Sequence, residues 1–528
     1  MALTRRAVLG AAASSLLPAV ASADVNNLLA PRWFGHAQVE ERARRLAQRP
    51  HEPPGRRLPP SIGAMDFDAW REIRFRPEAS LFEKASDRFR LQAFHLGHLF
   101  KRPVRLNLVK GDTAAPIAYS PADFDYGHHV FDPPLPPDLG HAGWRMNYPL
   151  NAPGVFDELI SFIGSSYFRV LGRGQVYGLS ARGLSIGTGR LDNNEEFPFF
   201  REFWFRMPEE GADPAQDRLI FYALLDSPSV AGAYAFELHP GEVSRIDVKA
   251  TLFARRRIDD IGIAPLTSMY FIGENDRHYN DRNRYDDYRP EMHDSDGLQL
   301  HLADGRWLWR PLRNPQIQEL SYFHTTDIRG FGLMQRDRVF SNYQDIDLAY
   351  QARPSYWIEP KGDWGPGRVE LVELATRDET ADNIVAAWLP ADPVEPDRPV
   401  TFAYTLHAGA DFASMPPLGR VRHTFAAPVG ALGAVREQRH HGSRRFLVDF
   451  SGGPLDAYVT RPEALQGHLV TKGGKTIRSF LTPNPQLPGV RAIIDVKGIN
   501  GETIFMEASL RAGETPLTET WSYRWKVE

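Results

Sequence analysis

Short stretches of alternating apolar and polar residues recur along most of the chain. Glycine, proline, asparagine and aspartate separate them, and long amphipathic helices between them are missing. A period of two puts successive side chains on opposite faces of a strand. The pattern predicts an all-β, antiparallel sandwich and argues against Rossmann or TIM-barrel folds. The clearest examples are 104–109, 218–225, 245–252, 368–374, 401–406, 445–450 and 519–527.

One segment has a helical pattern instead. Residues 34–48 place Val39, Ala43 and Leu46 on one face, at spacings of four and three. Five prolines between residues 50 and 60 then end the helix, because proline removes a backbone donor and clashes with the preceding turn.

A proline-rich stretch suggests where the chain divides. Residues 389–399 hold four prolines in eleven positions and no apolar period, which is typical of a stiff linker. About 130 residues follow, with six or seven strand-like runs. We therefore predict a large N-terminal β-sandwich over 24–395 and an immunoglobulin-like β-sandwich over 396–528.

Composition excludes several classes of function. The 528 residues include 62 Lys+Arg and 66 Asp+Glu, and the net charge of −4 gives no reason to bind nucleic acid or anionic lipid. The absence of cysteine excludes disulfides, thiolate metal sites, iron–sulfur clusters and a cysteine nucleophile. We expect no cofactor.

The first 23 residues have the features of a removable signal peptide. Arg5 and Arg6 precede a mild apolar run over 7–20 and the small residues Ala-Ser-Ala. The start resembles a twin-arginine export signal, although Val8 and Gly10 depart from its usual pattern, so ordinary secretion is the alternative. Either route predicts a bacterial periplasmic location.

Two acidic segments are candidates for chemistry. The segment 271–298 concentrates acids, arginines, histidines and aromatic rings, and its Asp294–Gly297 stretch fits an active site and a plain Asp-rich turn equally well. A fragment of a calcium loop is a further interpretation, but the remaining acids of an EF-hand are not in position. The patch 378–383 immediately precedes an apolar strand. Burial there would raise the pKa of a carboxyl, as a general acid requires, although a capped hairpin tip would have the same pattern.

Aromatic residues lie between these two patches, with Arg353 among them. Rings beside carboxylates and arginine suit a polyhydroxylated ligand, whose C–H faces pack on the rings. The same residues are also suited to the core of a sandwich. They are Trp307, Trp309, Tyr343, Tyr350, Tyr356, Trp357 and Trp364.

Other motifs are weak. Residues 183–187 match G-x-S-x-G, but the turn-rich run that follows is a poor start for the helix of a nucleophile elbow. Three histidine pairs, at 95 and 98, 128 and 129, and 440 and 441, lack the H-E-x-x-H context of a zinc site, so we expect no metal.

Seven segments carry a resemblance to a known family: 156–169, 174–184, 195–198, 289–298, 331–333, 353–357 and 382–385. They resemble the periplasmic glucan biosynthesis proteins G and D, also called OpgG and OpgD or MdoG and MdoD. The similarity extends over nearly the whole mature chain, and the twin-arginine-like leader favours the D type.

The resemblance implies a galactose-mutarotase-like sandwich followed by an immunoglobulin-like one. It implies a role in osmoregulated periplasmic glucan biosynthesis that shapes the β-1,2-glucan backbone, as an inverting endo-β-1,2-glucanase or a transglycosylase. The alternative is a non-catalytic glucan-binding scaffold that assists the membrane glucan synthase. A homodimer is also suggested by the family.

The resemblance also implies roles for individual residues. Asp382 is the candidate general acid and Asp294 the candidate base, with the proton passing through water or a substrate hydroxyl. Inverting hydrolysis needs such a pair of carboxyl groups. The residues expected to bind substrate or relay protons are Tyr350, Arg353, Glu379 and Trp357.

Overall fold

The structure is a computed structural model that describes residues 34–55, 58–190, 195–276, 287–412, 415–430 and 442–527. Strands account for 49% of the chain and helices for 10%, so the predicted all-β class is confirmed. The expected leader, 1–23, lies outside the described residues. None of the helices in the described ranges is long and apolar enough to cross a membrane.

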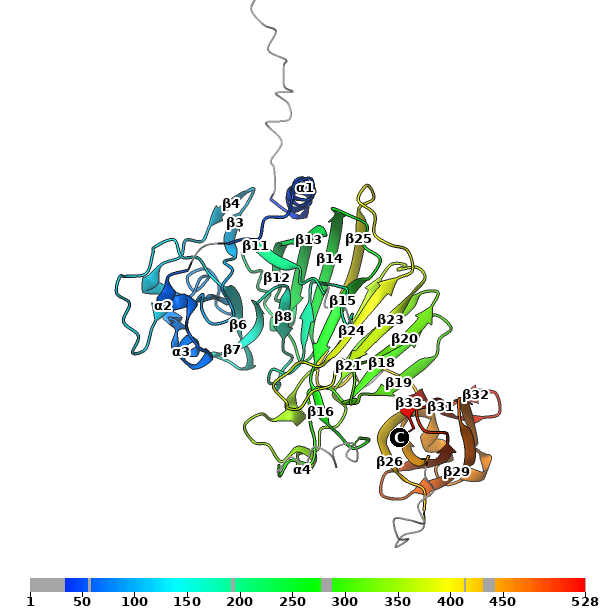
Figure 1. The fold of residues 1–528 in the computed structure, drawn as a ribbon. Helices are drawn as coiled ribbons and strands as arrows, with labels where there is room; N and C mark the ends of the chain where they lie inside the picture. Colours follow the sequence, from blue (N-terminus) through cyan, green and yellow to red (C-terminus); the bar gives the residue numbers. More distant parts are fainter. Residues whose placement is uncertain are drawn as a thin grey trace, which may run out of the picture.

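Two large sheets pack face to face in the main body (Figure 1). The first sheet has ten strands, and β10 (Leu184–Ile186) pairs with β15 outside its linear order. That order is β2 (Arg90–Phe94), β6 (Gly143–Ala152), β7 (Val155–Ile163), β8 (Tyr167–Val170), β9 (Ser180–Arg182), β15 (Ile261–Ser268), β24 (Ile384–Pro390), β23 (Gly367–Glu373) and β20 (Glu319–Thr325).

The second sheet has fifteen strands and continues into the C-terminal part of the chain. The strands β28 (Gln466–Lys472), β31 (Thr503–Ala512) with β32 (Thr515–Pro516), and β33 (Thr520–Lys526) form its C-terminal end. The order then runs through β19 (Trp307–Pro311), β18 (Gly297–Leu302), β21 (Ile328–Met334), β22 (Ser355–Lys361), β25 (Val400–Gly409), β14 (Ser244–Ala254), β13 (Val230–His239), β12 (Leu219–Asp226), β11 (Phe199–Arg206), β3 (Arg105–Lys110) and β4 (Thr113–Pro116).

Aromatic side chains from both sheets form the main core. Trp144 of β6 meets Phe205 of β11 and Phe221 of β12 at ring-centroid distances of 4.8 and 5.0 Å. Phe221 stacks in turn on Phe236 of β13 at 4.7 Å. Successive residues of a strand point to opposite faces, so these rings lie on the face between the sheets. Their neighbours Trp204 and Tyr222 lie on the other face, where they are buried in a separate cluster with Val39 and Ala43 of the N-terminal helix.

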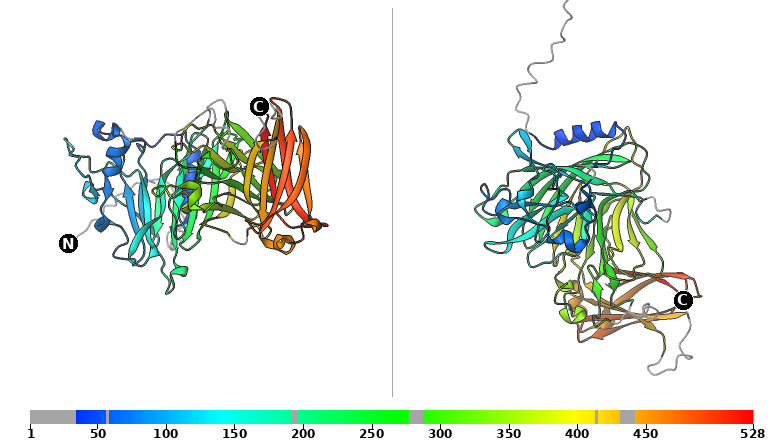
Figure 2. Two further views of the ribbon diagram at one scale, coloured as in Figure 1. Left: turned by 90° about the horizontal axis from the view of Figure 1, so that it is seen from below. Right: turned by 60° about the vertical axis from the view of Figure 1, so that its left-hand side comes forward.

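The C-terminal part forms a second, smaller sandwich at one end of the main body (Figure 2). A sheet of β26 (Arg420–Pro428), β27 (Ser443–Ser451), β30 (Gly489–Lys497) and β29 (Lys475–Asn484) lies against the strands β28, β31 and β33. Phe446, Trp521 and Tyr523 pack between the two layers.

The predicted boundary at residue 395 is too early. Strand β25 pairs along its whole length with β14 and β22, so residues 400–409 belong to the large sandwich. The proline-rich stretch is held against that sandwich as well, because Val394 is buried and forms a bridge with Ile258. The second sandwich therefore begins after Gly409.

Helices are short and peripheral. The predicted first helix is confirmed as α1 (His36–Ala47), whose buried Val39 and Ala43 cover β12, β13 and β14. The others are α2 (Pro60–Gly63), α3 (Phe67–Glu72) and α4 (Phe340–Tyr343). Short 3₁₀ segments form at Pro77–Ala79, Pro121–Asp123, Pro214–Gln216, Tyr350–Ala352, Gly453–Tyr458 and Pro462–Ala464. Two small pairs, β1 (Arg74–Phe75) with β5 (Phe124–Asp125) and β16 (Tyr270–Ile272) with β17 (Met292–His293), complete the fold.

Candidate functional site

Asp382 lies on the wall of a groove with a volume of about 710 Å³. The residue after it, Asn383, is fully buried at the start of β24 and anchors this part of the chain. Its side-chain amide donates to the carbonyl oxygens of Tyr270 and Leu374, both at 3.0 Å, and accepts from the Tyr270 backbone N–H at 2.8 Å. Asp382 is thus fixed by its neighbour while its own side chain remains exposed. The desolvation expected at this carboxyl from the sequence is not found.

Asp294 follows the short strand β17 and is 4% exposed. Its backbone N–H donates to the carbonyl of Met269 at 2.8 Å, and its carboxylate forms an ion pair with the guanidinium of Arg353. Such a contact suits a carboxylate that has to stay charged. The Asp-Ser-Asp-Gly turn also has a structural part, because Asp296 accepts backbone hydrogen bonds from Arg336 and Asp337.

Arg353 connects the two candidate acids. Its guanidinium lies 4.1 Å from the ring centre of Tyr350, and its side chain passes so close to Gly178 that a Cβ there would meet Arg353 Cδ at 2.8 Å. Burial lowers the pKa of Arg353 to about 10; the positive charge of Arg169 lowers it too, whereas the negative charge of Asp382 opposes the shift. Arg353 therefore contacts Asp294 and also interacts electrostatically with Asp382.

Glu379 joins this group from the same loop as Asp382. The phenol of Tyr350 donates a hydrogen bond to Glu379 at 2.6 Å, and Arg289 pairs with the same carboxylate at 2.8 Å. Arg289 also pairs with Asp287 and Asp345, so it ties three acids together. Burial and the hydrogen bond to Glu379 raise the pKa of the Tyr350 phenol. The structure thus brings together Asp294, Arg353, Tyr350 and Glu379, with Asp382 on the adjoining groove wall.

Trp357 is placed elsewhere. Its side chain is 2% exposed, and its ring stacks on Trp307 at 5.6 Å. Its neighbour on β22, Tyr356, turns to the opposite face, where its hydroxyl donates to the carbonyl of Val170. Successive residues of a strand point to opposite sides, so Trp357 packs in the core shared with the C-terminal sandwich.

Most of the predicted aromatic ligand surface is likewise core. Six of the seven rings between the acidic patches are buried, and only Trp364 is partly exposed. The interpretation of these rings as sandwich core, left open by the sequence, therefore accounts for most of them. Tyr350 differs because its hydroxyl and ring face contact Glu379 and Arg353.

The groove contains residues that the sequence analysis did not select. Tyr167 and Arg169 lie two residues apart on β8 and line the same groove as Asp382, and Phe197 is 46% exposed there. Burial raises the pKa of the Tyr167 phenol, and the charge of nearby Asp382 adds to this shift. The signal that could have found them is the polar–apolar alternation of β8, which sets Tyr167 and Arg169 on the face opposite Phe168 and Val170.

Two of the weaker motifs have structural roles. Ser185 is buried in the middle of β10, which pairs with β15, so the G-x-S-x-G segment forms no strand-to-helix elbow. His95 hydrogen-bonds Leu96 and Tyr119 within the core. His440 and His441, and residues 277–286 of the first acidic segment, lie outside the described residues.

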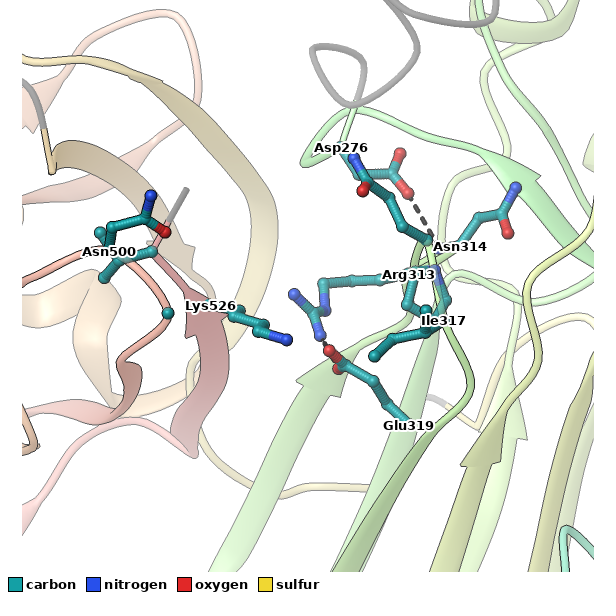
Figure 3. A pocket seen from close by; sticks show the side chains of 11 residues that line it. Asp276, Arg313, Asn314, Ile317, Glu319, Asn500 and Lys526 are labelled. Atoms are coloured by element: carbon teal, nitrogen blue, oxygen red, sulfur yellow. Dashed lines mark hydrogen bonds and ion pairs between the residues drawn. The ribbon is translucent and has the colours of Figure 1, made fainter. Parts of the chain in front are cut away.

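A second cavity, of about 340 Å³, lies between the two sandwiches (Figure 3). Its acids are already engaged: Glu319 pairs with Arg313 and Arg524, and Asp276 accepts a hydrogen bond from the backbone of Asn314. Burial raises the pKa of Asp276 to about 6. The side chain of Asn314 also exchanges two hydrogen bonds of 3.0 Å with the backbone of Thr376. Asn314, which lines this cavity, therefore anchors the start of the loop that carries Glu379 and Asp382.

Comparison with known proteins identifies the family. The model of the periplasmic glucan biosynthesis protein family, MdoG, matches residues 34–525. Glucans biosynthesis protein D 1 of Ralstonia nicotianae is 43% identical, with 98% of this chain and 96% of that protein covered. Glucans biosynthesis protein G of Pseudomonas paraeruginosa is also 43% identical, with 94% and 93% covered.

These relatives include both D-type and G-type proteins at equal identity, so identity alone does not separate the two types. Among solved structures, the galactosidase domain of alpha-galactosidase-sucrose kinase, AgaSK, is similar with a TM-score of 0.26 at 11% identity, over 64% of this chain and 42% of that one. The match over nearly all of the described chain and the 43% identity lead to one conclusion: this chain belongs to the periplasmic glucan biosynthesis protein family.

Proposed function

We propose that the protein shapes the β-1,2-glucan backbone as an inverting endo-β-1,2-glucanase or a transglycosylase, in the periplasm. The observation that carries the proposal is the arrangement around Arg353, which pairs with Asp294 and is influenced by the charge of groove-lining Asp382. Inversion requires one carboxylic acid at the departing oxygen and one carboxylate that activates the attacking hydroxyl.

The exposures of the two acids fit different roles. Asp382 is open to the groove and can reach a glycosidic oxygen, so we assign it as the general acid. In this proposal a glucan chain bound in the groove, rather than the fold alone, removes water from its carboxyl. Asp294 is nearly enclosed, so it would take up a proton through an intervening water or sugar hydroxyl rather than touch the sugar directly. Tyr350 and Glu379 position Arg353, and Tyr167 and Phe197 offer ring faces for glucose units.

The second candidate function is a non-catalytic glucan-binding scaffold that assists the membrane glucan synthase. The enclosure of Asp294 and its pairing with Arg353 favour it, since a structural ion pair would look the same. Both functions use the groove that Asp382 lines.

One experiment separates them. Purified protein is incubated with linear β-1,2-glucan, and the products are analysed by mass spectrometry and by counting new reducing ends. Shortened or cyclised chains support the enzyme, with Asp382→Asn and Asp294→Asn each lowering the rate by orders of magnitude while the fold is kept. Asp378→Asn, an exposed carboxyl on the same loop, is the matched control and should keep the rate. Binding without products, or full activity in either active-site variant, would favour the scaffold or remove that residue from its role.

A further inference from the structure

We propose that Glu72, His128 and His129 form a binding site for a divalent transition-metal ion of the Zn²⁺ type. This site is separate from the groove acids and does not depend on the function proposed above. One ligand atom from each residue lies within 4.8 Å of those of the other two, and both His128 Nδ1 and His129 Nε2 approach Glu72 Oε2.

The fold brings these three residues together through a short strand pair. Glu72 ends α3 two residues before Arg74 of β1, and β1 pairs antiparallel with β5, with Arg74 opposite Asp125. Continuing that register places Glu72 opposite Gly127, and a Cβ at Gly127 would lie 3.7 Å from the Glu72 side chain. The two histidines follow Gly127 directly.

A tight turn then directs both imidazoles back to the carboxylate. Gly127 has a φ of +59°, a backbone conformation that residues with a side chain rarely adopt. The backbone N–H of His129 donates to the carbonyl of Tyr126 at 3.0 Å. The two rings lie side by side with centroids 4.7 Å apart. As a result, adjacent residues face the same carboxylate.

The spacing matches a metal site. His128 Nδ1 lies 2.9 Å and His129 Nε2 3.1 Å from Glu72 Oε2. Ligands bound tetrahedrally at Zn–N and Zn–O lengths of about 2.0–2.1 Å are separated from one another by about 3.3 Å. Each histidine nitrogen is therefore within a few tenths of an ångström of the ligand spacing expected from the Glu72 oxygen, and the three ligand atoms stay within 4.8 Å of one another.

The hydrogen-bond geometry of these three groups also favours a metal site. Glu72 Oε2 is enclosed, yet among the described residues it accepts no hydrogen bond, although two ring nitrogens lie close to it. The N–H directions of the rings therefore miss this oxygen. His129 Nε2 instead lies 3.0 Å from the carbonyl oxygen of Ala69, so ligation would exchange that hydrogen bond for a metal bond.

The chemistry of the ligands selects the class of ion. Two imidazoles and one carboxylate suit Zn²⁺ and its neighbours in the transition series, whereas Mg²⁺ and Ca²⁺ prefer oxygen ligands alone. His128 is 77% exposed, so water can complete the coordination and the ion can exchange with solvent.

A metal ion at this site would restrain α3, which packs against the wall of the groove that contains Asp382. Trp70 of α3 packs on Phe100 at 4.8 Å between ring centres, and Phe100 lines the groove that contains Asp382. A bound ion would tie the end of α3 to the loop after β5 and so limit the movement of this wall.

The test uses tag-free protein dialysed against a chelator and titrated with ZnCl₂ by calorimetry, with Co²⁺ absorption as a probe of tetrahedral geometry. We expect one ion per chain, a rise in Tm with Zn²⁺, and at least a tenfold loss of affinity in each of Glu72→Gln, His128→Gln and His129→Gln. The matched control is His407→Gln, since His407 faces a single exposed carboxylate, Glu359, at 3.0 Å. It should bind as the wild type does.

Circular dichroism of each variant without metal checks that the fold is kept. The proposal is overturned if the wild type binds no stoichiometric Zn²⁺, if binding persists unchanged in the folded ligand variants, or if His407→Gln abolishes it.

Discussion

The side-chain amide of Asn383 pairs with both backbone groups of Tyr270, accepting from its N–H at 2.8 Å and donating to its carbonyl at 3.0 Å. Asn383 directly follows Asp382, and the ring of Tyr270 stacks on His293, which directly precedes Asp294. One buried amide thus fixes the relative positions of the two chain segments that carry the candidate acids.

We expect Asn383→Ala to destabilise the protein and to lower activity in the folded fraction. The change leaves the buried backbone groups of Tyr270 and Leu374 without their partner, and each unsatisfied group costs about 1–3 kcal/mol. With three such groups affected, urea denaturation should show a loss of at least about 3 kcal/mol. Asn342→Ala, which removes a single side-chain bond to Asp337, is the control and should lose much less. Equal losses in both variants would contradict this role.

Gly178→Ala should impair glucan cleavage in a protein that still folds. The added Cβ would meet Arg353 at 2.8 Å from Cδ and 3.0 Å from Cβ, so the arginine must shift, which disturbs its ion pair with Asp294. We expect kcat to fall at least tenfold while unfolding free energy changes by about 1–3 kcal/mol. Gly430→Ala, where a Cβ meets nothing within 4 Å, is the control. An unchanged kcat in Gly178→Ala would show that the cleavage rate does not depend on the exact position of Arg353.

Tyr350→Phe should have a mild effect and Tyr350→Ala a severe one. Phenylalanine keeps the ring that covers Arg353 but loses the 2.6 Å hydrogen bond to Glu379, which Arg289 continues to pair. One such bond contributes about 1–1.5 kcal/mol, a roughly five- to tenfold change in rate if it acts on the transition state. Steady-state rates on β-1,2-glucan test this. If both variants lose the same activity, the ring has no separate role. Tyr322→Phe, at an exposed tyrosine on β20, is the control.

The attachment of the C-terminal sandwich should depend on pH. Glu274 of the large sandwich accepts a hydrogen bond from the backbone of Thr424 and contacts His423 of β26 at 2.8 Å. Burial raises the pKa of Glu274 from its ordinary 4.5 to about 7, and the hydrogen bond from His423 to Glu274 raises the pKa of His423 as well.

Both groups therefore bind protons more strongly in the folded protein than in the unfolded chain. Their stabilising contribution is complete below pH 4.5 for Glu274 and is lost as pH rises through about 7. Buried His95 and His141, whose pKa values burial lowers to about 4, act in the opposite sense. We thus expect the difference in unfolding free energy between wild type and Glu274→Gln to decline between pH 5 and 8. A difference that is constant with pH would contradict the assignment.

The sequence predicted the strand-rich class, the first helix and the location of Asp382 before a buried strand, because each depends on local periodicity. It misjudged residues whose environment is set by distant segments. The alternation along its strand predicts which face of the sheet Trp357 lies on. It does not predict whether that face binds a ligand or packs in the core, because that depends on Trp307, fifty residues earlier. The proline-rich stretch looks like a free linker because the bridge between Val394 and Ile258 has no local signal.

The candidate site shows the same division. Asp294 and Arg353 were selected individually, yet their contact arises from the folding of two separate loops around Tyr350 and Gly178. Tyr167 and Arg169 were missed because the loop with Asp382 reaches them only in three dimensions.

The parallel pairing of β19 with β33, at Leu308 with Thr520 and Trp309 with Trp521, has a consequence for how the chain can be shortened. Deleting the last hundred residues would uncover the flank of β19 and the apolar rings of Trp307 and Trp309, leaving unpaired backbone groups that recruit other molecules. A truncated form should therefore precipitate rather than persist as a folded large sandwich.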